Sequence, residues 1–224
     1  MKIEVWSDYA CPFCYIGEKR LQRALNELGK DIEVEFKSFE LDPTASKEVI
    51  SATDERFAQK YSLSLDAARK KIEQISLMGR NEGIDFKYLT TRYTNTFDAL
   101  RLTKFAQEKG HNEIIIKLFD AYFTKNLELS DHKVLKKIAV ECGLDGEEVE
   151  NVLNSDRYAA EVREDEREAA LIGIHSVPYF IIGGKYGLSC AQPVEILKQA
   201  INEALIDENL NGMTCGANGC KFDG

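Results

Sequence analysis

The stretch that decides the fold is Lys2-Ile3-Glu4-Val5-Trp6-Ser7-Asp8-Tyr9-Ala10-Cys11-Pro12-Phe13-Cys14. Its first residues are typical of a short strand, and a helical pattern follows from Pro12 to Gly29. Free backbone N–H groups and partial positive charge at a helix start favour the thiolate form of Cys11. Cys14, one turn further on, can attack a mixed disulfide formed at Cys11. This placement of a Cys-x-x-Cys motif therefore predicts redox chemistry.

Two other interpretations of the motif are weaker. Half of a zinc site would need a second ligand pair, because zinc is held by four ligands in paired spacing. The other short cysteine spacing is Cys215 to Cys220, in a Gly/Asn-rich tail. A purely structural disulfide across two residues would close too small a loop to stabilise the chain much.

Composition narrows the classes of function. The 224 residues are 44% hydrophobic and carry a formal net charge of −9, so we expect no nucleic-acid partner and no anionic-membrane partner. Six cysteines are too few for a disulfide scaffold. Strand-like alternation from Lys2 onward predicts that no signal peptide is present. Together these features predict a reducing, cytoplasmic location.

The order of elements predicts an α/β fold. Residues 32–37 alternate apolar and polar, and with the first strand and helix they make a βαβ unit. From Asp42 to about Ser155 no strand alternation is evident, and Ser64, Asn95 and Ser130 can cap helices there. A charged helix follows over residues 157–172, then an apolar strand over 179–182. Gly183-Gly184 can turn it into a second strand, and a helix starts after Pro193.

This order, βαβ followed by helices and then αββα, predicts a thioredoxin-like core interrupted by an all-helical insertion domain. The predicted divisions are residues 1–43 and 156–206 for the two halves of the core, 44–155 for the insertion, and 207–224 for a mobile tail that holds a second cysteine pair.

Val177-Pro178 is the second chemical feature. A proline just before a strand of such a core is predicted to be cis, with its ring beside the active-site sulfur. Val177 would then offer its backbone to a bound substrate. A proline that merely starts an edge strand is the alternative, and the upstream Cys-x-x-Cys argues against it.

Several runs together resemble the DsbA family of thiol oxidoreductases. These are the run from Ser7 to Gly17, Asn95-Thr96-Phe97-Asp98-Ala99, Ser176-Val177-Pro178-Tyr179-Phe180 and Cys190-Ala191-Gln192-Pro193. More narrowly, the chain resembles the FrnE-like branch, which is related to 2-hydroxychromene-2-carboxylate isomerases and kappa-class glutathione transferases. The resemblance implies that Cys11 attacks, that Cys14 resolves and that Pro178 is the cis-proline.

The chain departs from that branch at three positions. Leu100 stands where a histidine is frequent, Cys190 where a glycine is usual, and Phe13 where tryptophan is commoner. Phe13 keeps an aromatic side chain beside the cysteines and is, with Val177, a predicted substrate-binding residue. Cys190 adds a thiol near the sheet.

Other polar residues have structural interpretations. Asp8 could relay a proton, but a turn or capping role is favoured. Lys19 and Arg20 fit a solvated helix face, and His175 fits a surface histidine. Cys142 shares a helix face with apolar residues and is expected to be a small buried hydrophobe.

The leading function is a cytosolic thiol–disulfide oxidoreductase or disulfide isomerase that acts on protein or small-molecule disulfides. Cys11, Cys14 and Pro178 are the predicted catalytic residues, with no metal and no organic cofactor. The alternative is a glutathione-dependent isomerase or transferase of the same fold, against which Cys14 argues. A third hypothesis is a non-enzymatic accessory protein that binds a partner through its helices.

Cys215 and Cys220 resemble an extra pair found in some FrnE-like proteins. They are a possible auxiliary redox pair that could reach Cys11 along an extended tether from Ile206. A local disulfide or a metal clip in the tail is the competing interpretation, and it stays open.

Overall fold

A four-stranded sheet forms the centre of the molecule, with strand order β2-β1-β3-β4. The computed structural model describes residues 1–211, 213–216 and 219–222, with side chains described through residue 208. The β1/β2 pair is parallel, whereas β1/β3 and β3/β4 are antiparallel. The four strands are β1 (Lys2–Ser7), β2 (Glu33–Ser38), β3 (Tyr179–Ile182) and β4 (Tyr186–Ser189).

Helices form most of the remaining secondary structure of the described chain. They are α1 (Pro12–Leu28), α2 (Thr53–Tyr61), α3 (Leu65–Asn81), the short η1 (Tyr88–Thr90), α4 (Phe97–Glu108), α5 (Ile114–Phe123), α6 (His132–Glu141), α7 (Gly146–Leu153), α8 (Ala159–Leu171) and α9 (Val194–Asn211). The order β1-α1-β2, then helices, then α8-β3-β4-α9 confirms the predicted thioredoxin-like fold class. The division into domains stays a prediction. Among the described residues, no helix is long and apolar enough to cross a membrane.

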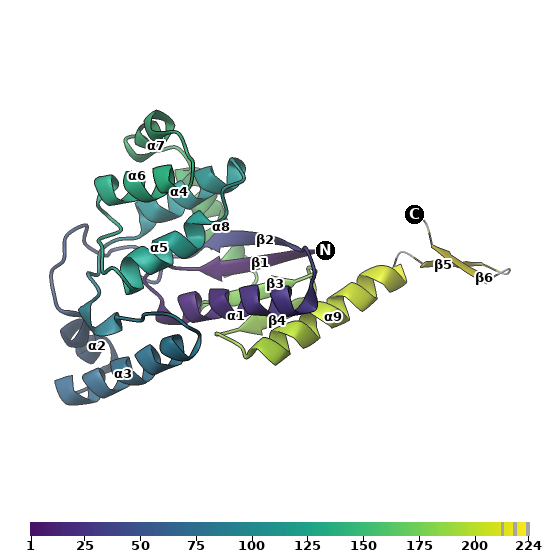
Figure 1. Ribbon diagram of the computed structural model, residues 1–224, viewed down its shortest axis with the longest axis horizontal. Coiled ribbons are helices and arrows are strands. Elements are labelled where there is room, and N and C mark those ends of the chain that lie inside the picture. Colours follow the sequence, from purple (N-terminus) through teal and green to yellow (C-terminus); the bar gives the residue numbers. More distant parts are fainter. Residues whose placement is uncertain (212, 217–218, 223–224) are drawn as a thin grey trace.

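Side chains of β1 alternate between two cores. Ile3 and Val5 pack on the face that α1 and α9 cover, together with Leu21 and Leu197. Trp6 points to the other face, and its Nε1 donates a hydrogen bond to the carbonyl of Asp165 in α8 at 3.0 Å. Figure 1 shows α1 and α9 along one side of the sheet, with α4 to α8 on the other. The period-2 pattern of a strand thus builds both halves of the core.

The predicted helix caps are confirmed only in part. Ser64 caps α3, because its Oγ accepts a hydrogen bond from the Ala67 N–H at 3.2 Å. The cap predicted at Asn95 is wrong, because Thr96 is the N-cap of α4, although the Asn95 Oδ1 accepts a hydrogen bond from the Phe97 N–H at 2.9 Å. The cap predicted at Ser130 is wrong. Asp131 is the N-cap of α6 instead, because its carboxylate accepts a hydrogen bond from the Lys133 N–H at 2.8 Å.

The C-terminal segment also differs from the prediction. α9 continues to Asn211, which contradicts the extended tether expected from Ile206 to Cys215. The strands β5 (Met213–Gly216) and β6 (Gly219–Phe222) then form a hairpin whose register places Cys215 opposite Cys220. In Figure 1 this hairpin lies beyond α9, at the opposite end of the molecule from the start of α1. The side chains of both cysteines lie outside the described residues, so their pairing and redox role stay predictions.

Candidate active site

Cys11 and Cys14 occupy the start of α1, as the sequence predicts. Cys11 is the N-cap residue, with extended backbone angles, and Pro12 is the first helical residue. The Cys11 N–H donates to the carbonyl of Asp8 at 3.0 Å, and the Cys14 N–H donates to the carbonyl of Cys11 at 3.1 Å. These bonds fix the turn that carries both thiols, and both thiols are free.

The two thiols have different surroundings. Both are buried, but Cys11 lines a cavity and Cys14 lies behind it. Burial raises the pKa of the Cys14 thiol well above that of free cysteine, and hydrogen bonding and charge interaction with Cys11 raise it further. The pair is therefore asymmetric, with Cys14 kept protonated.

Val177-Pro178 is a cis peptide bond, as predicted. The Cys11 Sγ donates a hydrogen bond to the Val177 carbonyl at 3.5 Å, which brings residues 166 positions apart into contact. The Pro178 ring lies against Gly17 of α1, where an added Cβ would stand 3.1 Å from Pro178 Cγ and 3.2 Å from Phe180 Cζ. The absence of a side chain at Gly17 thus lets the helix approach the proline closely.

Asp8 is a structural anchor for the cysteine turn. Its carboxylate accepts hydrogen bonds from the Ala10 N–H at 3.0 Å, the Leu41 N–H at 2.7 Å and the Thr96 hydroxyl at 2.9 Å. Burial raises the pKa of Asp8, although the three hydrogen bonds oppose that shift. These hydrogen bonds connect the cysteine turn to the segments that contain Leu41 and Thr96. They agree with the favoured turn or capping role of Asp8.

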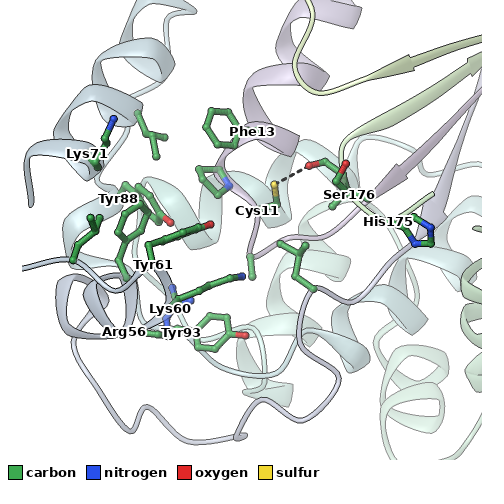
Figure 2. Close-up of a pocket in the computed structure, with 17 residues that line it drawn as sticks. Cys11, Phe13, Arg56, Lys60, Tyr61, Lys71, Tyr88, Tyr93, His175 and Ser176 are labelled. Atoms are coloured by element: carbon green, nitrogen blue, oxygen red, sulfur yellow. Dashed lines mark hydrogen bonds between the residues drawn. The ribbon is translucent and has the colours of Figure 1, made fainter. Parts of the chain in front are cut away.

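A cavity of about 480 Å³ opens in front of Cys11. One side, the cysteine wall, comes from the β1–α1 turn and the segment before β3: Ala10, Cys11, Pro12, Phe13, His175, Ser176 and Val177. The other side, the helical wall, comes from α2, α3, η1 and their connections: Arg56, Phe57, Lys60, Tyr61, Leu63, Lys71, Ile75, Tyr88 and Tyr93. Leu41 joins the two walls. Figure 2 shows Phe13 on one side of Cys11, with Lys60 and Tyr61 extending toward it from the helical wall.

The helical wall is the part of the site that sequence reasoning missed. α2 was not expected, although it supplies Arg56, Phe57, Lys60 and Tyr61. His175 is exposed, as predicted, and it also lines the cavity. One signal was available, because Arg56 and Lys60 are four residues apart and share one face of a helix.

Of the other cysteines whose side chains are described, Cys142 and Cys190 do not line the cavity. Cys142 is buried, as expected for a small hydrophobe, and burial raises the pKa of its thiol. Cys190 is exposed and directly follows β4, where its N–H donates to the Pro178 carbonyl at 2.9 Å. Among the described residues, no group of three or more His, Cys, Asp and Glu side chains could hold a metal ion.

Comparison with known proteins identifies the family. The model of the DSBA-like thioredoxin domain matches residues 2–202. The chain belongs to this family. The crystal structure of a probable DsbA oxidoreductase, SCO1869 from Streptomyces coelicolor, is 35% identical, covers 100% of both chains and superposes with a TM-score of 0.87. The family match supports thiol–disulfide oxidoreductase activity.

Two further proteins are similar over most of the chain. The uncharacterized protein YwbO of Bacillus subtilis (strain 168) is 31% identical over 186 residues, which are 81% of this chain and 86% of YwbO. The cytosolic disulfide reductase DsbM from Pseudomonas aeruginosa, in a structure with GSH, is 13% identical. It covers 94% of this chain and 99% of its own, with a TM-score of 0.60, and at this identity the likeness shows the fold alone.

Proposed function

We propose that this protein exchanges disulfides with its substrates through Cys11 and Cys14. The observation that carries the proposal is the contact between the Cys11 Sγ and the Val177 carbonyl at 3.5 Å, beside a cis-proline and at the mouth of a cavity. The difference between the two thiols adds support. A substrate in the cavity can reach Cys11, and the raised pKa of Cys14 keeps that thiol protonated until the second exchange.

The reaction proceeds in two exchanges. The Cys11 thiolate attacks one sulfur of a substrate disulfide, so that a Cys11–substrate disulfide forms and the other substrate sulfur leaves as a thiolate, which takes a proton from water. Cys14 then loses its proton and attacks the Cys11 sulfur. The second substrate thiol is released and a Cys11–Cys14 disulfide remains. The substrate gains two electrons, the pair loses two, and a thiol in solution restores the pair.

Val177 and Phe13 are the proposed substrate contacts. The Val177 carbonyl accepts from the Cys11 thiol, so it becomes available to a substrate N–H once the Cys11 proton has gone. Phe13 is 36% exposed, which is high for a large apolar side chain next to a reactive sulfur. We place the protein in a reducing cytoplasm and propose glutathione as one thiol partner, in line with the description of DsbM as a cytosolic disulfide reductase with GSH.

The test is an assay of disulfide reduction with a protein substrate such as insulin. Cys11→Ser should abolish the activity, whereas Cys142→Ser, which changes a buried thiol outside the cavity, should retain it. Full activity in Cys11→Ser would overturn the proposal. Thiol addition to an aromatic electrophile, with no disulfide reduction, would favour the glutathione-dependent transferase instead.

A further inference from the structure

The helical wall concentrates positive charge in an acidic protein. Arg56, Lys60 and Lys71 all line the cavity, and none of its described lining residues is acidic. In the part of the chain whose side chains are described, no carboxylate lies within ion-pair distance of these three cations. The chain as a whole has a formal net charge of −9 and should repel anions. In front of Cys11 the three cations have the opposite effect and attract anions.

Arg56 is held in a position suited to a carboxylate. Its guanidinium lies over the Tyr93 ring at 3.7 Å from the centroid, and the Tyr93 hydroxyl donates to Asp42 at 3.2 Å. Stacking occupies the face of the guanidinium and leaves its N–H edge free. Arg56 Nε is buried and has no hydrogen-bond partner among the described residues. Arg56 still lines the cavity with the accessible part of its guanidinium, and a bound carboxylate is a strong acceptor for those N–H groups.

Arg56 and Cys11 also share a neighbour. Burial raises the pKa of Tyr88, the Arg56 cation opposes that shift, and charge on Cys11 adds to it. Tyr88, Arg56 and Cys11 all line the same cavity. A molecule bound in that cavity can therefore contact the Cys11 sulfur with one part and the Arg56 guanidinium with another.

The rest of the wall fits an apolar body of small size. Phe57, Tyr61 and Ile75 supply apolar surface between the cations. The volume of about 480 Å³ lies within the range of roughly 300–1,000 Å³ typical of small-molecule sites. We propose that the cavity selects small disulfides that carry a carboxylate on an apolar or aromatic body, with Arg56 as the carboxylate anchor and Lys60 and Lys71 as attracting charges.

This inference rests on the proposed function, and the covalent step is the same. The Cys11 thiolate attacks the substrate sulfur nearest to it, and a Cys11–substrate disulfide forms. The other half of the substrate leaves as a thiolate. Cys14 then releases the bound half, so that one substrate disulfide becomes two thiols and the enzyme pair becomes a disulfide.

The experiment measures single-turnover rates of the reduced protein with four disulfides. Dithiobis(nitrobenzoate) is aromatic with carboxylates, and dithiodipyridine is aromatic and neutral. Dithiodipropionate is aliphatic with carboxylates, and hydroxyethyl disulfide is aliphatic and neutral. Each rate is corrected for the slow background of Cys11→Ser, which removes the contribution of Cys190 and the other thiols. For each disulfide, the rate of the wild type is divided by the rate of the variant. The intrinsic reactivity of the disulfide is common to both rates and cancels.

Arg56→Gln should slow both carboxylate disulfides by about tenfold to a hundredfold, the range for a hydrogen bond to a charged group. Both neutral disulfides should change by less than about threefold, because they make no such bond. The double variant Lys60→Gln, Lys71→Gln should slow only the carboxylate disulfides, and that effect should fade at high salt. Lys70→Gln, an exposed neighbour of Lys71 outside the cavity, should change none of the four rates.

Equal effects on charged and neutral disulfides in both variants would overturn the inference. The double variant decides the matter if Arg56→Gln fails to fold, because both lysines are exposed and make no ion pair with a described residue. Failure of the proposed function would look different, since Cys11→Ser would then react with all four disulfides at the wild-type rate.

Discussion

The two walls of the cavity are built in different ways. The cysteine wall is fixed by main-chain bonds, such as the Cys11 N–H to Asp8 carbonyl bond at 3.0 Å and the Cys190 N–H to Pro178 carbonyl bond at 2.9 Å. The helical wall is held by side chains, such as the Phe57 and Tyr61 rings, whose centroids lie 4.6 Å apart. Main-chain bonds constrain geometry whatever the side chains are, whereas side-chain packing varies with sequence.

The chemistry of the walls differs in the same way. The reactive thiol, its carbonyl partner and the cis-proline lie on or behind the cysteine wall, while the three cations lie on the helical wall. Changes in the cysteine wall should therefore affect every substrate alike. Changes in the helical wall should affect the choice among substrates. Four predictions test this contrast, in order of decreasing effect.

Cys14→Ser should produce the largest effect on turnover. A serine hydroxyl cannot displace the substrate from Cys11, so a mixed disulfide should accumulate and multiple-turnover rates should fall by about a hundredfold or more. The loss should be the same for charged and neutral disulfides. Mass spectrometry of the trapped adduct and steady-state rates would show this. Unchanged turnover would mean that Cys14 does not resolve the mixed disulfide.

Gly17→Ala should act through the same wall, because the new Cβ would meet the Pro178 ring at 3.1 Å. Overpacking costs about 1–3 kcal/mol. Alanine has a higher helix propensity than glycine, which offsets about 1 kcal/mol of this cost. We therefore expect a net loss of up to about 2 kcal/mol in the free energy of unfolding. All four disulfides should react more slowly by a similar factor.

Gly146→Ala in α7 is the matched control, because its Cβ would meet only ordinary contacts, the nearest at 3.4 Å. It should be neutral or slightly stabilising. Chemical denaturation of both variants makes the comparison. A Gly17→Ala variant as stable as Gly146→Ala would show that the helix does not need to approach Pro178 closely.

The sequence predicted the cysteine wall better than the helical wall, and the reason is physical. Cys11, Cys14 and Pro178 stand at element boundaries, where the strand pattern and the helix start locate them. α2 has nine residues and an alanine at its N-cap, so neither length nor a capping side chain marks it. Its start is stabilised by Glu55, whose carboxylate accepts from the Ala52 N–H at 3.3 Å.

The cation cluster could not be predicted from spacing alone. Arg56 and Lys60 share one helix, but Lys71 comes from α3, and only the packing of α2 against α3 brings them to one cavity. Whether Arg56 forms an ion pair also depends on the tertiary structure, because that structure decides which carboxylates lie nearby. Val177-Pro178, by contrast, was identified because a proline before a strand in this order of elements has few interpretations.

Asp98→Asn should lower stability and leave substrate choice unchanged, since Asp98 does not line the cavity. Burial alone would raise the pKa of Asp98, but hydrogen bonds from His132, Arg101 and Lys47 hold it down to about 2. A lowered acid pKa means that the ionised group stabilises the fold above its ordinary value of 3.8. This contribution is lost as the pH falls from about 4 to about 2.

The expected loss for Asp98→Asn at neutral pH is roughly 1–2 kcal/mol, reduced from the full pKa shift because Lys47 is exposed and His132 is partly exposed to solvent. The variant should also lose the stability change between about pH 4 and pH 2. Asp156→Asn, an exposed site, is the control and should change neither. Urea unfolding at several pH values measures both effects. An altered preference for carboxylate disulfides in Asp98→Asn would contradict the separation of fold from selectivity.

Tyr61→Ala should give the smallest and most selective effect. Tyr61 is 54% exposed, its ring packs against Phe57, and it lines the helical wall. An aromatic substrate would lose one stacking partner, worth about 0.5–1.5 kcal/mol, or roughly a twofold to tenfold slower reaction. Aliphatic disulfides should react at nearly the wild-type rate, with or without a carboxylate. Leu77→Ala, which removes an equally exposed apolar side chain from α3 outside the cavity, should leave all four rates unchanged. An equal loss for aliphatic and aromatic disulfides in Tyr61→Ala would instead show that the Tyr61 ring supports the geometry of the cysteine wall. The contrast between the two walls would then fail at this residue.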